Sequence, residues 1–266
     1  MPNYALLGAT GSTGTAILCH LLSNSTSRPE NLKLNIFVRS KDKLLSAFPA
    51  LESADQPFDI AIFEGSINDR ESAALRDCLQ DVDVIFACIG TNEAHSGMTI
   101  VQDATTSIIT VLQQYKKDQG ANHKIPTIIQ LRSSSLNPSP TLPASAKKMA
   151  WFFFYHIYTD LSRACELLAT ADPELLRYIF VDPPSIHDAE GTEATGYELF
   201  TAAEEGKVQE SAISYADLGA AFCEVAVRKG EFVGEGVLVS ATGTVRMTWG
   251  PLVGFMARGL GSRIWG

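Results

Sequence analysis

Cysteine is scarce in this chain of 266 residues, and the five cysteines are widely scattered. The closest pair, Cys78 and Cys88, lies ten residues apart, so the sequence has no CxxC motif for a metal or for redox chemistry. An odd number of cysteines also fits a set of disulfides poorly. Because scattered, reduced thiols are typical of the cytoplasm, we expect a cytoplasmic protein. An apolar content of 45% is enough for a core that needs no disulfide or metal.

Long apolar runs and an excess of basic residues are also missing. The most apolar run, residues 149–158, has about half the length that a helix needs to cross a bilayer. The 21 basic and 30 acidic residues give a net charge of −9, which disfavours nucleic acid and anionic membranes as partners. The histidines show no spacing typical of a metal site. These absences leave a globular protein whose expected partner is a small molecule.

Short apolar runs alternate with longer helical segments over the first two thirds of the chain. Strands are predicted at residues 4–7, 34–38, 58–63, 82–88, 125–131 and 176–181. Most of them are apolar on both faces, as buried parallel strands are. Helices are predicted between them, at residues 12–22, 41–48, 69–79, 97–117 and 146–171. This alternation predicts an α/β fold with a doubly wound, Rossmann-type parallel sheet.

A glycine-rich turn, GATGSTG, directly follows the first predicted strand and opens the first helix. Gly8 permits the tight turn, Gly11 lets the backbone approach a pyrophosphate, and Gly14 permits close packing of the helix on the strand. The N–H groups and the dipole of the helix N-terminus favour an anion at this place. We therefore predict dinucleotide binding, with a purely structural turn as the alternative. The predicted binding residues here are Gly8, Thr10, Gly11, Ser12, Thr13 and Gly14.

After the sixth strand the character of the chain changes. The segment 186–206 is polar and acidic, and a helix, a strand and a helix are predicted after it, over residues 214–228, 236–241 and 245–263. We expect two parts. Residues 1–182 form a nucleotide-binding domain, and residues 183–266 form a small C-terminal substrate lobe that is integrated with it.

Several segments resemble those of one known family. The resemblance is to the NmrA-like branch of the atypical short-chain dehydrogenases/reductases, of the type found in fungal secondary metabolism. It is carried by GATGSTG, IFVRSKDKL, VIFACIG, IIQLRSSSLNP and ISYADLGAAF, which together span most of the chain. The resemblance implies that NAD(P) binds at the glycine turn. It adds Gly90, the last residue of VIFACIG, to the cofactor-binding residues.

Basic residues after the second predicted strand favour NADP over NAD. Arg39 follows this strand directly, and Lys43 lies close behind it. An acidic residue at this place typically binds the ribose 2′-hydroxyl of NAD, whereas a basic residue receives the 2′-phosphate of NADP. The planar guanidinium of Arg39 can bind phosphate through two hydrogen bonds. We therefore predict NADP(H), bound by Arg39 and Lys43, with NAD as the alternative cofactor. The alternative is that these residues are solvated basic side chains at the start of a helix and bind no ligand.

The lysine of the short-chain reductase motif is missing. In that family a serine after the fifth strand acts with a Tyr-x-x-x-Lys pair, whose spacing puts both side chains on one face of a helix. Ser133 and Ser134 match the serine position. Tyr155 and Tyr158 are the candidate tyrosines, but a threonine and a serine stand four positions after them. The predicted catalytic residues are therefore Ser133, Ser134, Tyr155 and Tyr158, without a lysine to assist proton transfer. A core aromatic is the alternative reading of Tyr158.

Three functions remain open from the sequence. The resemblance implies an NADP-dependent oxidoreductase that acts on a small, largely apolar aromatic, polyketide-like or terpenoid metabolite. The aromatic run at residues 151–158 either lines the pocket for such a substrate or packs in the core. The missing lysine keeps open a non-redox isomerase, dehydratase or cyclase on the same scaffold. A regulator that senses NADP, like the founding NmrA-type protein, is the third function. No feature of the sequence indicates the oligomeric state.

Overall fold

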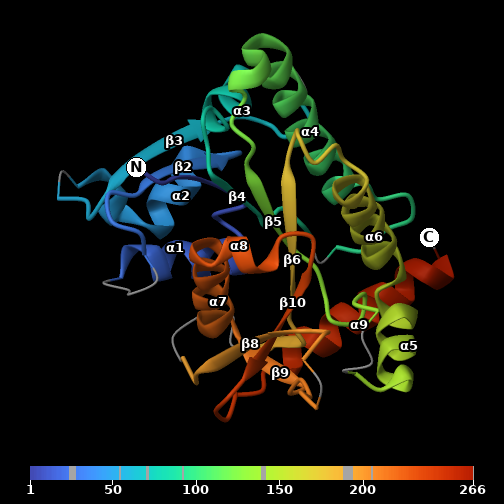
Figure 1. The fold of residues 1–266 in the computed structure, drawn as a ribbon. Helices are drawn as coiled ribbons and strands as arrows, with labels where there is room; N and C mark the ends of the chain where they lie inside the picture. The colour runs from blue at the N-terminus through green and yellow to red at the C-terminus, as the bar shows by residue number, and fades with distance from the viewer. Residues whose placement is uncertain are drawn as a thin grey trace.

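An eight-stranded sheet forms the centre of the protein (Figure 1). The computed structural model describes residues 1–23, 28–53, 55–69, 72–91, 93–138, 142–187, 194–204 and 206–265. The strands follow the spatial order β3-β2-β1-β4-β5-β6-β10-β8, and all neighbours pair in parallel except β10 and β8. Their bounds are β1 Asn3–Leu7, β2 Lys33–Val38, β3 Asp59–Glu64, β4 Val84–Ala87, β5 Thr127–Leu131, β6 Arg177–Asp182, β8 Tyr197–Thr201 and β10 Gly236–Ala241. The predicted doubly wound parallel sheet is confirmed.

Helices connect most of these strands. They are α1 Ser12–Leu22, α2 Lys41–Ala47, α3 Ala73–Cys78, α4 Ile100–Gln119, α5 Ala144–Phe153, α6 Tyr155–Ala169, α7 Tyr215–Val227, α8 Lys229–Phe232 and α9 Trp249–Trp265, with short 3₁₀ turns at Pro49–Glu52 and Gly120–Asn122. Two short strands, β7 Ser185–His187 and β9 Ala212–Ser214, pair in parallel outside the main sheet. Within the described residues, no helix has the length and the apolar character needed to cross a membrane.

Apolar side chains pack on both faces of the sheet and form two cores. Along β1, Tyr4 and Leu6 belong to one core and Ala5 and Leu7 to the other, as the alternation of side chains along a strand requires. Residues of α1, α2 and α7 complete the first core, and residues of α3, α4 and α6 complete the second. Burial on both sides is the reason why these strands are continuous apolar runs in the sequence.

The prediction of one helix over residues 146–171 is wrong. The chain forms two helices, α5 and α6, and it breaks at Phe154, which has φ −110° and ψ 25°. The two helices have different environments, because α6 buries five residues, four of them in the second core, whereas α5 buries none completely. The break lets α5 leave the sheet and contact α9. In a continuous helix, the aromatic residues of α5 would extend α6 along the same axis.

The chain after Pro183 returns to the main sheet. Strand β10 pairs with β6, and β8 closes this edge of the sheet as the antiparallel neighbour of β10. The predicted polar segment 186–206 thus contains strand β8, which the sequence analysis missed, and residues 188–193 and 205 of that segment lie outside the described residues. The division into residues 1–182 and 183–266 remains a proposal. Its two parts share one sheet.

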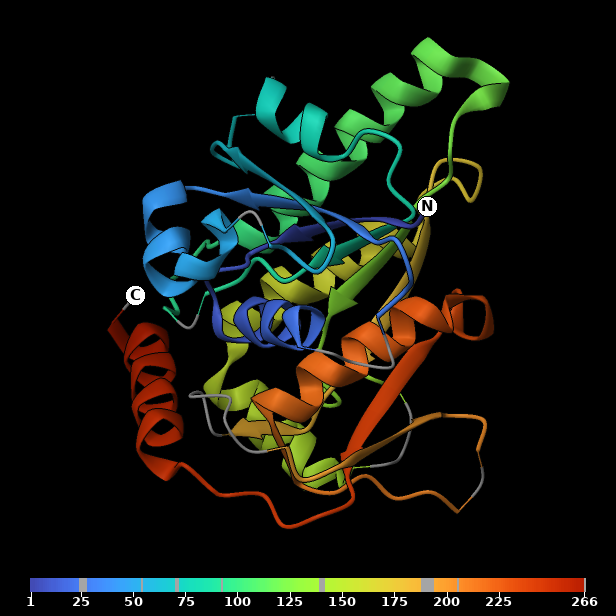
Figure 2. The ribbon, with the colours of Figure 1, turned by 90° about the vertical axis from the view of Figure 1, so that its left-hand side faces the viewer.

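Helices α1 and α7 lie side by side on the first face of the sheet, at a separation that depends on a glycine (Figure 2). Gly219 of α7 faces the backbone of Ala16 in α1. A Cβ at Gly219 would lie 2.5 Å from both the carbonyl carbon and the carbonyl oxygen of Ala16. The two helices therefore touch backbone to backbone, and the position has no room for any other residue.

This contact predicts the effect of one methyl group on stability. We expect Gly219→Ala to lower the free energy of unfolding by about 1–3 kcal/mol, because the added carbon forces α1 and α7 apart. Urea denaturation followed by circular dichroism measures this difference. Gly230→Ala is the matched control, because Gly230 in α8 has open space around its Cβ position, and it should leave the midpoint unchanged or raise it. Equal midpoints for the two variants would contradict the proposed close contact.

Candidate active site

The glycine turn lies at the point where the strand order reverses. From β1 the chain crosses to β2 on one side, and β4 lies on the other side of β1. Open α/β sheets bind ligands at such a reversal, outside the carboxyl ends of the strands. Gly8 leaves β1 with φ +91°, and a Cβ there would lie 2.6 Å from the carbonyl oxygen of Cys88, just after β4. Both the backbone conformation and the space therefore require glycine.

The N-terminus of α1 presents its first N–H groups to this crevice. Gly11 precedes the helix and provides no side-chain cap, so the N–H groups of the first turn are available for an anion. A Cβ at Gly14 would overlap the carbonyl oxygen of Gly8, which explains how the helix packs so closely on the strand. Gly11 and Gly90 are exposed, and a Cβ at Gly90 would meet no described atom within 4 Å. This backbone cradle fits the pyrophosphate of a dinucleotide.

The remaining predicted cofactor residues surround the cradle. Ser12 is exposed at the start of α1, Thr10 is half-buried, and Thr13 is buried under the helix. Arg39 is exposed at the carboxyl end of β2, the strand beside β1, and Lys43 is exposed in the first turn of α2. The Ser40 hydroxyl between them accepts the backbone N–H of Lys43 at 3.2 Å and fixes the start of α2. Neither basic side chain forms a salt bridge with a described residue.

Ser133 and Tyr158 meet at the carboxyl end of β5. The Ser133 Oγ and the Tyr158 Oη lie 3.1 Å apart, within hydrogen-bonding distance, although the two residues come from a loop and from α6. Ser134 is buried, and its hydroxyl donates to the carbonyl oxygen of Pro183 at 2.7 Å. Tyr155 lies at the start of α6 with 44% of its surface exposed. Of the four predicted catalytic residues, the structure brings together Ser133 and Tyr158.

Two aromatic rings pack against the ring of Tyr158. The ring of Trp151 packs edge-on against Tyr158 with centroids 5.6 Å apart, and the ring of Phe154 lies 5.7 Å from Tyr158. Lys147 lies one helical turn before Trp151, and its Nζ donates to the carbonyl oxygen of Asn137 at 2.6 Å. The face of α5 that carries Lys147 and Trp151 therefore contacts the serine loop and the tyrosine, and it forms an aromatic wall beside the polar pair.

A buried ion pair, which the sequence analysis missed, holds the two strand ends beneath the serine loop. Asp182, at the end of β6, is fully buried and accepts two hydrogen bonds from Arg132, at 2.6 Å from Nε and 2.5 Å from Nη2. Asn137 donates a third hydrogen bond to the same carboxylate at 2.6 Å. A Cβ at Gly236 would fall within 3 Å of all three side chains, so this glycine makes room for the cluster. The signal of this ion pair in the sequence is a charged residue, Arg132, directly before Ser133.

Another buried carboxylate fixes α6, the helix that carries Tyr158. Asp160 is completely buried, and its two oxygens accept the backbone N–H groups of Val101 and Gln102 at 2.9 and 3.0 Å. These N–H groups belong to the first turn of α4, so Asp160 supplies the acceptor that this helix end needs. Tyr158 lies two residues before Asp160 on α6, so the bonds of Asp160 also fix the position of Tyr158.

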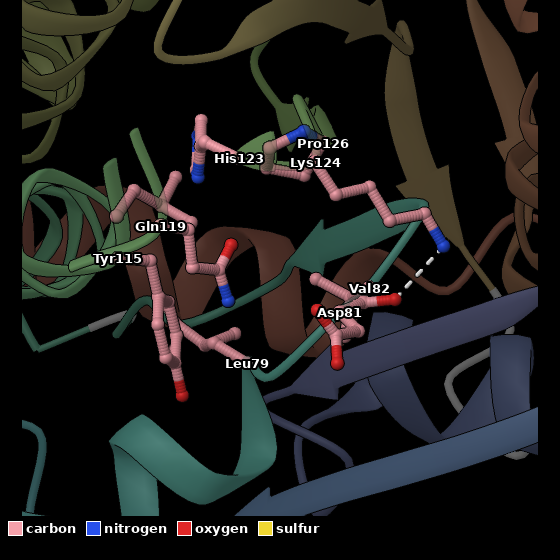
Figure 3. Close-up of a pocket in the computed structure, with 9 residues that line it drawn as sticks. Leu79, Asp81, Val82, Tyr115, Gln119, His123, Lys124 and Pro126 are labelled. Carbon is pink, nitrogen blue, oxygen red and sulfur yellow. Dashed lines mark hydrogen bonds between the residues drawn. The ribbon is translucent and has the colours of Figure 1, made fainter. Parts of the chain in front are cut away.

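A small pocket in the described part of the chain lies at the other end of the sheet (Figure 3). In this pocket the Nζ of Lys124 donates to the backbone carbonyl oxygen of Asp81 at 2.9 Å. Its lining comes from the amino ends of strands and the end of α4, namely Leu79, Asp81, Val82, Leu112, Tyr115, Gln119, His123, Lys124 and Pro126. It shares no residue with the crevice at the glycine turn. Among the described residues, no group of three histidine, cysteine or acidic side chains could hold a metal.

Known proteins share this arrangement of motifs. The model of a family described as NAD(P)H-binding matches residues 8–228, from the glycine turn to the end of α7. The chain belongs to this NAD(P)H-binding family. Averufin oxidase A from Aspergillus flavus is 44% identical over 267 residues, which cover 99% of this chain and 91% of that protein. Averufin oxidase stcO from Emericella nidulans is 42% identical and covers 97% of this chain and 89% of that protein.

Solved structures of the NAD(P)H-binding fold agree with the architecture. A short-chain dehydrogenase/reductase from Veillonella parvula in complex with NADP aligns with a TM-score of 0.64 and 17% identity, over 91% of this chain and 96% of that chain. At this identity the likeness concerns the fold alone. The sequence relatives make the chain an oxidoreductase of the NAD(P)H-binding family, which confirms the resemblance to NmrA-like and short-chain dehydrogenase proteins.

The ion pair beneath the site of this NAD(P)H-binding protein predicts a large effect on stability. We expect Asp182→Ala to lower the free energy of unfolding by about 3–5 kcal/mol, because it leaves the Arg132 guanidinium buried without its partner. Chemical denaturation of both proteins measures the loss. Asp118→Ala removes a carboxylate from a half-exposed pair with Arg76 and should cost about 0.5 kcal/mol or less. A loss at Asp182 as small as that of the control would contradict the role of the buried pair.

Proposed function

We propose that the protein is an NADP-dependent oxidoreductase whose substrate is a largely apolar, aromatic polyketide of the averufin type. The observation that carries the proposal is the pair of Ser133 and Tyr158 hydroxyls, 3.1 Å apart beside an aromatic wall. The glycine cradle at the strand reversal supports the cofactor. The likeness to two proteins named averufin oxidases supports the substrate, a polyketide metabolite.

The residues of the site have separate tasks in this proposal. A dinucleotide held by the glycine turn and the N-terminus of α1 would supply hydride transfer to or from a substrate carbon that carries an oxygen atom. Tyr158 gives a proton to this oxygen or takes one from it, and Ser133 holds the same oxygen by a hydrogen bond. The ring of Trp151 fixes the orientation of the apolar part of the substrate. Arg132 and Asp182 act at a distance, by holding the strand ends from which the serine loop starts.

A second candidate is a non-redox isomerase, dehydratase or cyclase, which the serine at position 162 favours. Position 162 lies four residues after Tyr158 on α6, where short-chain reductases carry the lysine. Incubation of the protein with averufin and either NADP⁺ or NADPH separates the two functions. An oxidoreductase changes the cofactor absorbance in proportion to product, whereas a non-redox enzyme forms product without that change. Neither product nor cofactor turnover from averufin would overturn the proposed substrate.

Replacement of the Tyr158 hydroxyl tests its catalytic role. We expect Tyr158→Phe to lower kcat about 10²–10⁴-fold, because the variant lacks the group that moves the proton. The dissociation constant of NADPH should stay the same, since the cradle is not altered. Tyr155→Phe removes the other candidate hydroxyl from the same helix and should retain most of the activity. The reverse order of the two losses would assign catalysis to Tyr155.

The preference between the two cofactors tests Arg39. We expect the parent protein to bind NADPH more tightly than NADH, and Arg39→Ala to abolish most of this preference by weakening NADPH alone. Titration of cofactor fluorescence gives both dissociation constants. Lys117→Ala removes the same charge from an exposed position near the end of α4 and should leave the preference intact. A parent protein with equal affinity for NADPH and NADH would refute the role of Arg39.

A further inference from the structure

Acidic residues are absent from two long stretches of this acidic chain. Residues 136–159 and 236–266 contain five basic residues and no aspartate or glutamate, although the whole chain has a net charge of −9. Helix α5 belongs to the first stretch and α9 to the second. The two helices contact each other at one side of the protein, with α6 beside them (Figure 1). The charge of the chain is therefore unevenly distributed, and the two acid-free stretches meet in space.

One face of α5 exposes apolar side chains to solvent. Met149 and Phe152 are 56% and 46% exposed, and Lys148 beside them is exposed as well. At 100° per residue these three positions lie within about 100° of one another around the helix. They define the exposed face of α5. Tyr155, which is also exposed, follows at the start of α6 and extends the series of large apolar groups.

Helix α9 packs beside this face and adds a basic residue near its end. A Cβ at Gly259 would overlap the carbonyl oxygen of Phe153, so α9 touches the backbone where α5 ends. Arg258, the neighbour of Gly259, is exposed. Lys148 is exposed before the apolar residues and forms no salt bridge with a described residue. Basic side chains thus lie at the start of the apolar face and beside its end.

The charge of this surface decides between its possible partners. In a twofold dimer both copies present the same surface, so the basic residues would meet basic residues. Neither α5 nor α9 has an acidic residue that could pair with them, which disfavours a second copy. A surface that is anionic outside and apolar beneath complements both kinds of side chain. Apolar residues accompanied by lysine and arginine are typical of helices that lie in the interface of a membrane.

We propose that α5 and α9 bind the surface of an anionic lipid bilayer. Met149 and Phe152 enter the boundary between headgroups and acyl chains, and Lys148 and Arg258 contact the lipid phosphates. The net charge of −9 does not prevent this contact, because salt screens charges beyond about 8 Å and only those near the lipid count. The inference goes beyond the proposed function and does not depend on it, since lipid binding requires neither cofactor nor substrate.

The place of this surface beside the candidate site gives lipid binding a use. Trp151, which packs against Tyr158, lies on the neighbouring face of the same helix. Apolar polycyclic compounds dissolve better in a bilayer than in water. For a substrate of the proposed kind, contact with the bilayer would therefore shorten the path to the aromatic wall.

Flotation of the protein with lipid vesicles tests this proposal. We expect the parent to float with vesicles of phosphatidylcholine that contain about 30% phosphatidylserine, and to stay unbound with phosphatidylcholine alone. Lys148→Glu combined with Arg258→Glu should weaken binding to the anionic vesicles about 25-fold or more, because each basic residue near such a surface contributes about fivefold. Met149→Ser combined with Phe152→Ser should weaken it about tenfold, through the loss of apolar side chains that enter the lipid.

Matched controls remove the same groups from other places. Lys117→Glu combined with Arg177→Glu reverses two exposed charges, at the end of α4 and the start of β6. Val227→Ser combined with Val233→Ser removes two exposed apolar side chains near the end of α7 and after α8. Both control variants should float like the parent. All variants should keep the thermal unfolding temperature and the dissociation constant of NADPH, because the altered side chains lie outside the cores and the cofactor cradle.

The outcomes identify the partner of this surface. A parent protein that does not float with anionic vesicles overturns the inference, and so do α5 and α9 variants that float as well as the parent. If the parent is instead a dimer that Met149→Ser combined with Phe152→Ser dissociates, and it binds no vesicles, the surface joins two copies. Retention on polyglutamate without vesicle binding would assign the surface to an acidic protein. Conversion of averufin without lipid binding removes this inference and leaves the proposed function, whereas lipid binding without conversion does the reverse.

Discussion

The fold of this protein depends on one place where the backbone comes closer to itself than a side chain allows. At Gly8 and Gly14 the turn between β1 and α1 packs against the end of β4 and against its own carbonyl group. This approach seats α1 on the first face of the sheet and directs its N-terminus at the crevice between β1 and β4. A bulkier turn would move the helix away, and the N–H groups of its first turn would no longer converge on one point.

Buried carboxylates perform the corresponding task on the other side of the crevice. Asp182 joins the ends of β5 and β6 through Arg132, and Asp160 joins α6 to the start of α4. Each carboxylate accepts several hydrogen bonds, which offset part of the cost of burying its charge. The Ser133 and Tyr158 hydroxyls lie between these two anchors. The precision of the site thus comes from polar groups that never touch a substrate, whereas the apolar cores supply the bulk of the stability.

Features with a local signal could be predicted from the sequence, and features that arise from distant contacts could not. The strands of the parallel sheet and the glycine turn each depend on residues within a short window, because burial on both faces and a positive φ leave a direct trace in residue type. The pairing of the serine loop with a tyrosine on the next helix could be expected from the resemblance.

The break at Phe154 could not be predicted, since neither proline nor glycine marks it and α5 is held by contacts to Asn137 and α9. Strand β8 is short and polar at its edges, so it looked like a loop.

The packing of α1 against α7 also has a consequence for the order in which the protein folds. Helix α7 follows α1 by about 200 residues, so α1 leaves the ribosome well before its partner is made. Until then the side of α1 that α7 will cover, around Ala16, has no native neighbour. Closure of so long a loop makes this docking a late, slow step with a high contact order. During synthesis this side of α1 therefore stays uncovered until α7 has been made.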